Sequence, residues 1–261
     1  MSINKKVPLI ILTLVFISLI FTSGFMYMAS SKVVLEKGEV ELHTYTKEVG
    51  KFIIKTIEDN AVRVKLISKN TVFKDLIKHR QSFPQDITNT TYYDSNENEL
   101  LRKANSILVN SKEELKEVEN MYLLDKEGTV IAHHNESFYG QNFAHESYFK
   151  EVIKTGEDAI GDMIISKIDK AKLLVFAEPI IENNEIIGML CQAVSVNSLN
   201  EMLVNTKIGD KGYCYVLDPT GRILIHPNDE IVGTENEIEV LNKTVSEGSK
   251  STGINDMKTK F

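Results

Sequence analysis

The hydrophobic positions of the chain first form one long run near the N-terminus. No charged residue occurs from Val7 to Ser31, and Lys5 and Lys6 precede this run. A helix needs about 20 apolar residues to cross the hydrocarbon core of a bilayer, and flanking lysines favour the cytoplasmic side. The pattern predicts an uncleaved membrane anchor, with the chain after Lys32 outside the cytoplasm. The alternative is a cleaved signal peptide, although its apolar region would be unusually long.

After this run, apolar positions recur at spacings of three and four, which is typical of one face of a helix. They include Phe52, Ile57 and Val64, with Lys and Glu filling the gaps. The pattern predicts a long stalk helix over 32–80. A polar loop is expected after it, followed by a second helical pattern over 99–118.

The pattern then changes to short apolar runs separated by turn residues, and one such hairpin is written twice. YLLDKEGTVIAHHN begins at Tyr122, and YVLDPTGRILIHPN begins at Tyr215. Both contain Asp-x-x-Gly, in which the Asp side chain can bond turn amides and Gly can adopt a positive φ. The repeat predicts two tandem α+β modules, each of which opens with the same hairpin of an antiparallel sheet.

Between the two copies, the pattern predicts a short helix over 147–154 that is ended by Gly156. Strands are expected at 162–167, 173–181 and 187–196. A further short helix is expected at 198–204, before the second copy of the hairpin.

Composition and chemistry narrow the function classes. The chain has 261 residues, is 42% hydrophobic and carries a net charge of -7, so no basic surface for nucleic acid is expected. Cys191 and Cys214 could pair once, but both lie in apolar runs, and buried free thiols are favoured. His133, His134 and His145 lack a spacing that fixes a metal site. With no nucleophile or phosphate-binding motif either, we expect no metal, no cofactor and no enzymatic activity.

The order of these segments resembles the double Cache (dCache) extracytoplasmic sensor domain of bacterial chemoreceptors and sensor kinases. The resemblance rests on the two hairpins and on ESYFKEVIKTGEDAIGDMIIS, KLLVFAEPIIENNEIIGMLCQAVSVNSL and GDKGYCYVLDPTGRILIHPN. It implies an α+β fold in which a long membrane-rooted N-terminal helix lies beside two tandem PAS-like (Cache) antiparallel-sheet modules, the second incomplete. The expected parts are an anchor at 1–31, the stalk helix at 32–80, a membrane-distal module at 81–205 and a membrane-proximal module at 206–261.

The resemblance also implies a function. The chain is expected to sense a small molecule outside the cytoplasm and to signal across the cell membrane, as part of a methyl-accepting chemotaxis protein that dimerises through the stalk helix. The ectodomain of a sensor histidine kinase or diguanylate cyclase is the alternative, and a cell-surface enzyme on a PAS-like scaffold is a second. Members of the family continue into a second transmembrane helix and an output domain, so the sequence is expected to be truncated before both.

Finally, the resemblance implies a ligand site. In the amino-acid receptors of this family, an Arg just before an aromatic pair holds the ligand carboxylate, and Tyr and Asp side chains hold its ammonium. By spacing, the Arg position falls on Glu146. The expected ligand-binding residues are Glu146, Tyr148, Phe149, Ile164, Ser166 and Ala193. Such a site disfavours amino acids and favours an amine or a neutral polar ligand. The alternatives are that Glu146 faces solvent at a helix N-terminus, or that the pocket binds no ligand directly.

Overall fold

The structure is a computed structural model that describes residues 3–82, 95–115, 117–166, 170–198, 213, 215–218 and 220–235. The chain divides into two units, Met1–Gly50 and Lys51–Phe261. The helix that the sequence predicts at 198–204 lies almost entirely outside the described residues.

The first unit is helical. Helix α1 (Ile3–Ser68) begins in this unit and ends in the second. Its segment Ile11–Gly38 has a mean hydropathy of 2.0, and none of it is buried. By length and composition alone, this segment is able to cross a membrane, and it overlaps the predicted anchor. The orientation of such a span stays a prediction from Lys5 and Lys6.

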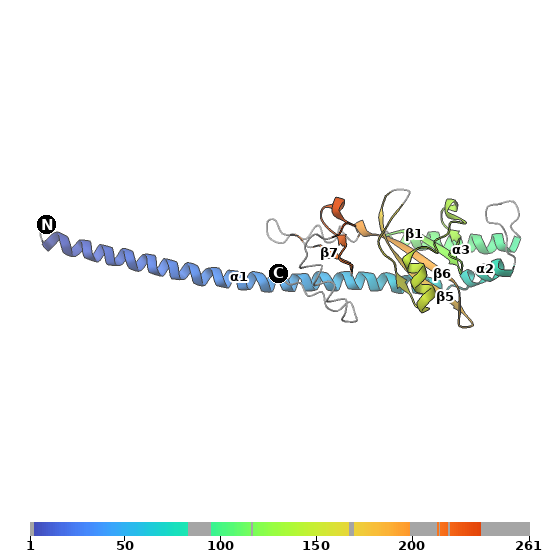
Figure 1. Cartoon of the computed structure of the whole chain (residues 1–261), viewed down its shortest axis with the longest axis horizontal. Coiled ribbons are helices and arrows are strands. Elements are labelled where there is room, and N and C mark those ends of the chain that lie inside the picture. Colours follow the sequence, from blue (N-terminus) through green and yellow to red (C-terminus); the bar gives the residue numbers. More distant parts are fainter. Residues whose placement is uncertain are drawn as a thin grey trace. The chain divides into compact units, whose positions relative to one another are not determined.

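In the second unit, the predicted stalk helix is interrupted. Helix α1 ends at Ser68, and α2 (Thr71–Ser82) begins after a break at Asn70. The Asn70 side-chain oxygen accepts a hydrogen bond from the Val72 amide at 3.1 Å. The prediction of one helix over 32–80 is therefore wrong, because Asn supplies the side-chain acceptor that starts a new helix. Helix α3 (Ser95–Glu114) lies alongside α2 (Figure 1).

The centre of the second unit is an antiparallel sheet in the order β2-β1-β6-β5-β3, with β4 also paired to β5. The strands are β1 (Val118–Asp125), β2 (Val130–His133), β3 (Ala159–Ile160), β4 (Ile164–Ile165), β5 (Lys172–Glu182) and β6 (Glu185–Ser195). The β5–β6 hairpin turns through Asn183 and Asn184, whose φ angles are 50° and 64°. Asn tolerates this left-handed conformation well, as the predicted turn required. Strand β3 was not predicted.

One face of the sheet packs against helices, and Gly188 of β6 explains how closely they approach. A Cβ atom on Gly188 would lie 2.4 Å from the Leu124 carbonyl oxygen and 2.8 Å from the Ile77 Cδ1 atom. Helix α2 can therefore approach β6 only because this position has no side chain. Phe73, Leu76 and Ile77 of α2 are almost fully buried.

The two copies of the repeated sequence form hairpins of the same structure. Strands β7 (Val216–Leu217) and β8 (Ile223–Ile225) form a separate two-stranded sheet. The carboxylates of Asp125 and Asp218 each accept hydrogen bonds from two backbone amides of their turns. Gly128 and Gly221 both have positive φ angles, 83° and 88°. Both copies therefore form a hairpin with the same turn, as predicted, and the two modules that they are expected to open stay a prediction.

The match extends to an irregularity of the strand pairing. The register shifts between Leu123 and Leu124 in the first copy and between Val216 and Leu217 in the second. These positions are equivalent in the repeat. Leu124 is fully buried, whereas Leu217 is only partly buried. The predicted α+β class, with antiparallel sheets that open with the same hairpin, is confirmed.

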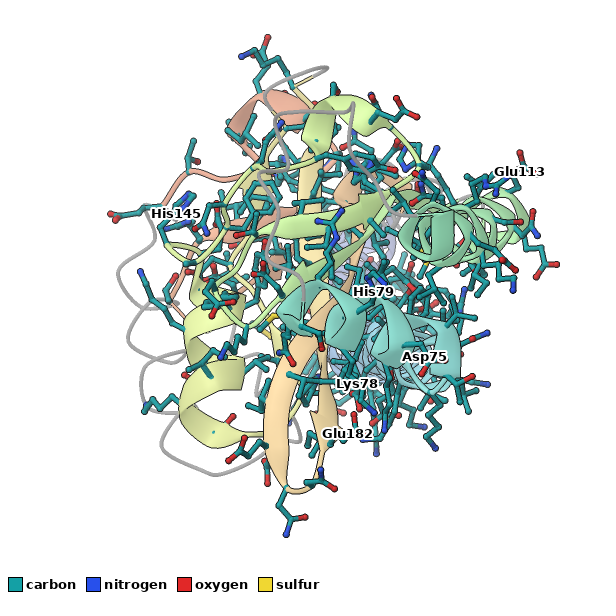
Figure 2. The ribbon with its side chains drawn as sticks, turned by 90° about the vertical axis from the view of Figure 1, so that its right-hand side faces the viewer. Asp75, Lys78, His79, Glu113, His145 and Glu182 are labelled. Atoms are coloured by element: carbon teal, nitrogen blue, oxygen red, sulfur yellow. The ribbon has the colours of Figure 1, made fainter. Side chains whose placement is uncertain are left out.

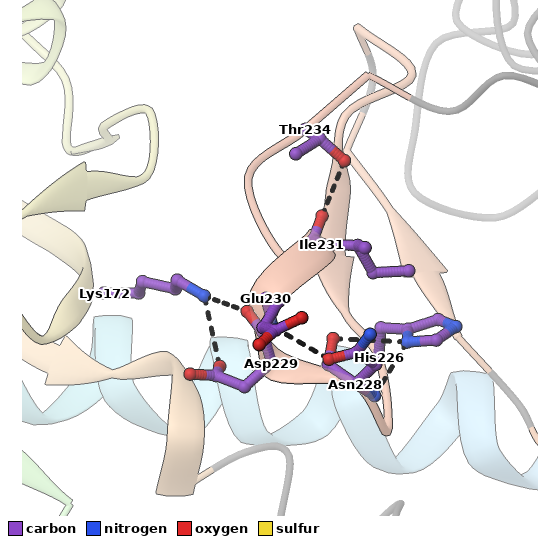
Figure 3. A network of polar contacts seen from close by, with 7 residues as sticks. All are labelled: Lys172, His226, Asn228, Asp229, Glu230, Ile231 and Thr234. Atoms are coloured by element: carbon purple, nitrogen blue, oxygen red, sulfur yellow. Dashed lines mark hydrogen bonds and ion pairs between the residues drawn. The ribbon is translucent and has the colours of Figure 1, made fainter.

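A short 3-10 helix follows the hairpin in each copy, η1 (Glu136–Phe138) and η2 (Asp229–Ile231). Asn228 caps η2 by accepting a hydrogen bond from the Glu230 amide at 3.1 Å. Figure 3 shows this cap beside Lys172, whose ammonium lies 3.2 Å from the Asp229 carboxylate. The contact joins the second hairpin to the start of β5.

Candidate functional site

The candidate site lies on the sheet face that helix α4 (Ser147–Thr155) covers. The helix begins after Glu146, whose backbone is extended, and ends at Gly156, which has a φ angle of 75°. The Gly156 amide donates to the Val152 carbonyl at 2.9 Å. This left-handed glycine is the usual way to end a helix, and the sequence predicted it. Tyr148 and Phe149 lie in the first turn and are buried against the sheet.

Small side chains on the sheet make room for these aromatic rings. A Cβ atom on Gly161 would lie 2.8 Å from the Tyr148 Cδ1 atom, so the ring occupies the space that a side chain would need. Ala159, Ala177, Ala193 and Cys191 belong to the same buried cluster. The floor of the site is therefore made of small residues on three adjacent strands, β3, β5 and β6.

A pair of phenols is the polar centre of this cluster. The hydroxyl oxygens of Tyr122 and Tyr148 lie 2.9 Å apart and are buried. Burial raises the pKa of both hydroxyls, and Cys191 and the charge of Glu146 add to the rise. Both groups therefore stay protonated. A hydroxyl pair shares only one of its two protons within the pair, and the Tyr122 hydroxyl also contacts the Cys191 thiol. Sulfur is a weak acceptor, so an oxygen or nitrogen atom of a ligand would be a stronger partner for the second proton.

Tyr122 was not among the predicted site residues. It lies on β1, where its register partners are His133 on β2 and Cys191 on β6. The only sequence signal was its place at the start of the repeated hairpin. Strand register, which the sequence does not give, brings it to Tyr148.

Glu146 lies at the edge of this cluster, directly before α4. Its side chain is 23% exposed, and one carboxylate oxygen lies 3.1 Å from Nε2 of the exposed His145. It makes no side-chain hydrogen bond to cap the helix. Its negative charge contributes to the raised pKa values of Tyr122 and Tyr148. Among the described contacts of the Glu146 carboxylate, the basic group is the imidazole of His145.

The remaining predicted residues lie on the neighbouring strands. Ala193 is 2% exposed and belongs to the cluster, and Ile164 of β4 packs against it. Ser166 lies in the turn after β4, where its amide donates to the Ala171 carbonyl at 2.8 Å. The structure therefore brings Ile164 and Ala193 together with the aromatic pair, whereas Ser166 is partly exposed and outside the cluster.

The histidines next to the site were considered for a metal centre. Among the described residues, no group of three or more His, Cys, Asp or Glu side chains could hold a metal ion. His133 is 1% exposed, and its Nδ1 atom accepts a hydrogen bond from the Asn135 amide at 2.8 Å. Its ring stacks on Phe138 at 4.3 Å between ring centroids. Burial, with the charge of His134 adding to it, lowers the pKa of His133 to about 3, so this imidazole is neutral.

The family model of the Cache domain (dCache_1) matches residues 38–260 of the chain. The chain belongs to the Cache domain family. No curated protein sequence matches it.

Solved structures share the Cache fold at low sequence identity. The sensor domain of the Vibrio cholerae histidine kinase DctB is 19% identical, with a TM-score of 0.60 over 78% of this chain and 73% of that one. A structure named methyl-accepting chemotaxis protein X is 14% identical, with a TM-score of 0.60 over 84% of both chains.

A third structure carries a ligand. The ligand-binding domain of the Pseudomonas aeruginosa amino-acid chemoreceptor PctC was solved in complex with GABA; it is 15% identical, with a TM-score of 0.52 over 72% of this chain and 74% of that one. At such identities the likeness is one of fold, and the ligand belongs to that protein. Chemoreceptors and a kinase sensor thus share this Cache fold.

Proposed function

We propose that this Cache-domain chain is the extracytoplasmic sensor of a membrane signalling protein and that it binds a small molecule on the sheet face beneath α4. Its family membership and the candidate span at Ile11–Gly38 support the proposal. We propose a chemotaxis receptor as the whole protein. The ectodomain of a histidine kinase is the second candidate, because a kinase sensor and a chemotaxis protein match this fold equally, each with a TM-score of 0.60.

The observation that carries the site is the buried pair of Tyr122 and Tyr148 beside Glu146. A buried hydroxyl usually has partners for its hydrogen-bonding groups, and beyond the proton shared within this pair the partner is the Cys191 thiol, a weak acceptor that a ligand could replace. Helix α4 packs on small residues of the strands, and its described hydrogen bond to a strand side chain is the contact of Tyr148 with Tyr122. We infer from these features that the site is a ligand-binding site covered by helix α4.

The proposed ligand class follows from charge. Ligand carboxylates are usually held by Arg, whose planar group bonds two oxygens at once, but the motif position carries Glu146. A ligand carboxylate beside this side chain would meet like charge in a partly buried place, which is unfavourable without a counter-charge. An ammonium group would instead pair with Glu146 and lie near aromatic rings that attract cations. We therefore propose an amine, or a neutral molecule that donates hydrogen bonds to Glu146.

Thermal unfolding of the full chain in detergent micelles tests the ligand class. We expect stabilisation by an amine from a panel of choline, ethanolamine and putrescine, and none by L-serine or L-isoleucine. At about 100 times its dissociation constant, a ligand adds roughly 2.7 kcal/mol of stability. Glu146→Gln keeps the shape of the side chain and should abolish the shift, whereas Glu157→Gln, on the exposed loop after α4, should preserve it. Stabilisation by the amino acids, or an amine effect that survives Glu146→Gln, would contradict the proposal.

The proposed topology is tested separately. Lys5 and Lys6 precede the candidate span, so the N-terminus should lie in the cytoplasm and the Cache modules, proposed at 81–205 and 206–261, outside it. Alkaline phosphatase fused after Phe261 should be active, because this enzyme needs an oxidising compartment for its disulfides. Activity of a reporter that works only in the cytoplasm, fused at the same position, would show the opposite orientation and contradict the proposed topology. The homodimer expected through 32–80 stays a prediction, which sedimentation of the full chain would test.

A further inference from the structure

Three polar contacts attach the last part of α1 to β5, to β6 and to the residue before β1. Arg63 donates to Glu117, the residue before β1, at 2.5 Å. Asn60 accepts a hydrogen bond from Gln192 of β6 at 2.6 Å, with both side chains buried. Lys65 lies 3.7 Å from Glu178 of β5. The sheet therefore holds this helix at three points across its width, on the face opposite α4.

The contact of Glu178 is the one of the three in which a carboxylate, rather than an amide, is poorly satisfied. Glu178 is 8% exposed. The distance of 3.7 Å from its Oε1 atom to the Lys65 ammonium is too long for a hydrogen bond. Its Oε2 atom is buried and has no hydrogen-bond partner among the described residues. A buried carboxylate normally receives several donors or a close counter-charge.

The charges around Glu178 do not compensate for its burial. Helix α1 presents Lys65, the turn after α1 presents Lys69, and the segment before β3 presents Asp158. The Asp158 carboxylate also lies 3.7 Å from the Lys65 ammonium. On β6, the register partner of Glu178 is the apolar Leu190. One lysine, half exposed to water, is thus shared between two carboxylates.

We propose that Glu178 is a proton-binding site through which the attachment of α1 to the sheet responds to the acidity of the medium. This function is independent of the small-molecule site, because Glu178 lies on the opposite face of the sheet. When Glu178 is ionised, it competes with Asp158 for Lys65 and holds α1 against β5. When it is protonated, Lys65 pairs with Asp158 alone, and one of the three attachments of α1 loses its charge.

The direction of the titration agrees with this geometry. Burial raises the pKa of Glu178, Lys65 opposes the rise, and Asp158 adds to it. Because the pKa is higher in the folded protein, the folded state binds the proton more tightly than the unfolded chain does. The stabilisation that comes from this proton is complete at low pH and is lost as the pH rises through the folded-state pKa.

The titration of Glu178 can be followed directly by NMR. In the full chain in detergent micelles, with ¹³C at the Glu side-chain carboxyl groups, the resonance that Glu178→Gln removes should have a midpoint above about 4.3, the value of an unperturbed Glu. Lys65→Met should raise this midpoint, and Asp158→Asn should lower it. Both changes are at half-exposed side chains, so folding is not at risk. A midpoint at or below the unperturbed value would overturn the proposal.

The attachment of α1 is tested in the same samples. Backbone amide resonances of residues 60–68 should shift with the midpoint of Glu178, and this shift should be absent in Glu178→Gln. The matched control is Glu182→Gln on the same strand. Lys78 donates to Glu182 at 2.9 Å (Figure 2), and this change should leave the midpoint of Glu178 in place. Amides of 60–68 that do not follow Glu178 would overturn the proposal whether or not a small-molecule ligand is found.

Discussion

Replacing Tyr148 with alanine is expected to lower the free energy of unfolding by about 3–5 kcal/mol, the usual cost of deleting a large buried aromatic side chain. Tyr148 is 1% exposed. Its ring fills the space above Gly161, and its hydroxyl is the hydrogen-bond partner of Tyr122. The variant would therefore leave a cavity and a buried hydroxyl that has lost its partner. Urea denaturation of the full chain, followed by circular dichroism, measures this loss.

Two control variants separate the contributions at Tyr148. Tyr148→Phe keeps the ring and removes the hydroxyl, and should cost about 1–3 kcal/mol because Tyr122 loses its partner. Ile153→Ala changes the exposed face of the same helix, where the residue is 43% exposed, and should stay within about 0.5 kcal/mol. If Tyr148→Ala cost no more than Ile153→Ala, the ring would not be packed against the sheet.

The second large effect is a loss of stability in acid that arises from His133. This imidazole is buried and neutral in the folded chain, with a pKa of about 3, whereas in the unfolded chain it should titrate near the usual value of about 6.5. The unfolded state therefore binds the proton first as the pH falls. Stability is lost progressively below about 6.5, and about 2 kcal/mol is lost by a pH of about 5.

The contribution of His133 is measured by comparing the pH dependence of urea denaturation in two variants. His133→Asn keeps an acceptor for the Asn135 amide but cannot bind the proton, so its stability should fall less steeply between pH values of about 6.5 and 5. His145→Asn, which removes an exposed imidazole, is the control. Glu178 acts in the opposite direction, so the comparison between variants is more informative than the wild-type curve alone. Equal slopes in wild type and His133→Asn would show that folding does not lower the pKa of His133 and would contradict this prediction.

Local signals in the sequence predicted the parts of the fold that depend on neighbouring residues. The left-handed Gly156 ends α4, and Asp125 and Asp218 organise the two turns, because each of these features is formed within a few residues. Asn70 had the same kind of signal as a helix cap, but the apolar spacing of the helix on both sides concealed it. Strand β3 was too short to give a pattern of its own.

The parts that could not be predicted depend on contacts between distant segments. Tyr122 and Tyr148 meet because the register of β1 and the approach of α4 over Gly161 bring them together. The burial of Glu178 likewise depends on where α1 crosses β5. The sequence of a strand such as β5 does not indicate whether the side chain of a charged residue reaches solvent. For this reason the sequence could assign Glu146 to the candidate site by its motif position. It could not identify Tyr122 as a residue of that site or Glu178 as a buried carboxylate.

We propose that a small molecule binds between α4 and the sheet. Hydrogen–deuterium exchange of the full chain, with and without saturating amounts of the amine that gives the largest thermal shift in the panel, tests this claim most directly. We expect slower exchange of backbone amides in α4, around Tyr148 and Val152, and in β6 around Cys191, with unchanged exchange in the β7–β8 hairpin. Protection confined to β7–β8, or a stabilising ligand that leaves α4 unprotected, would contradict it.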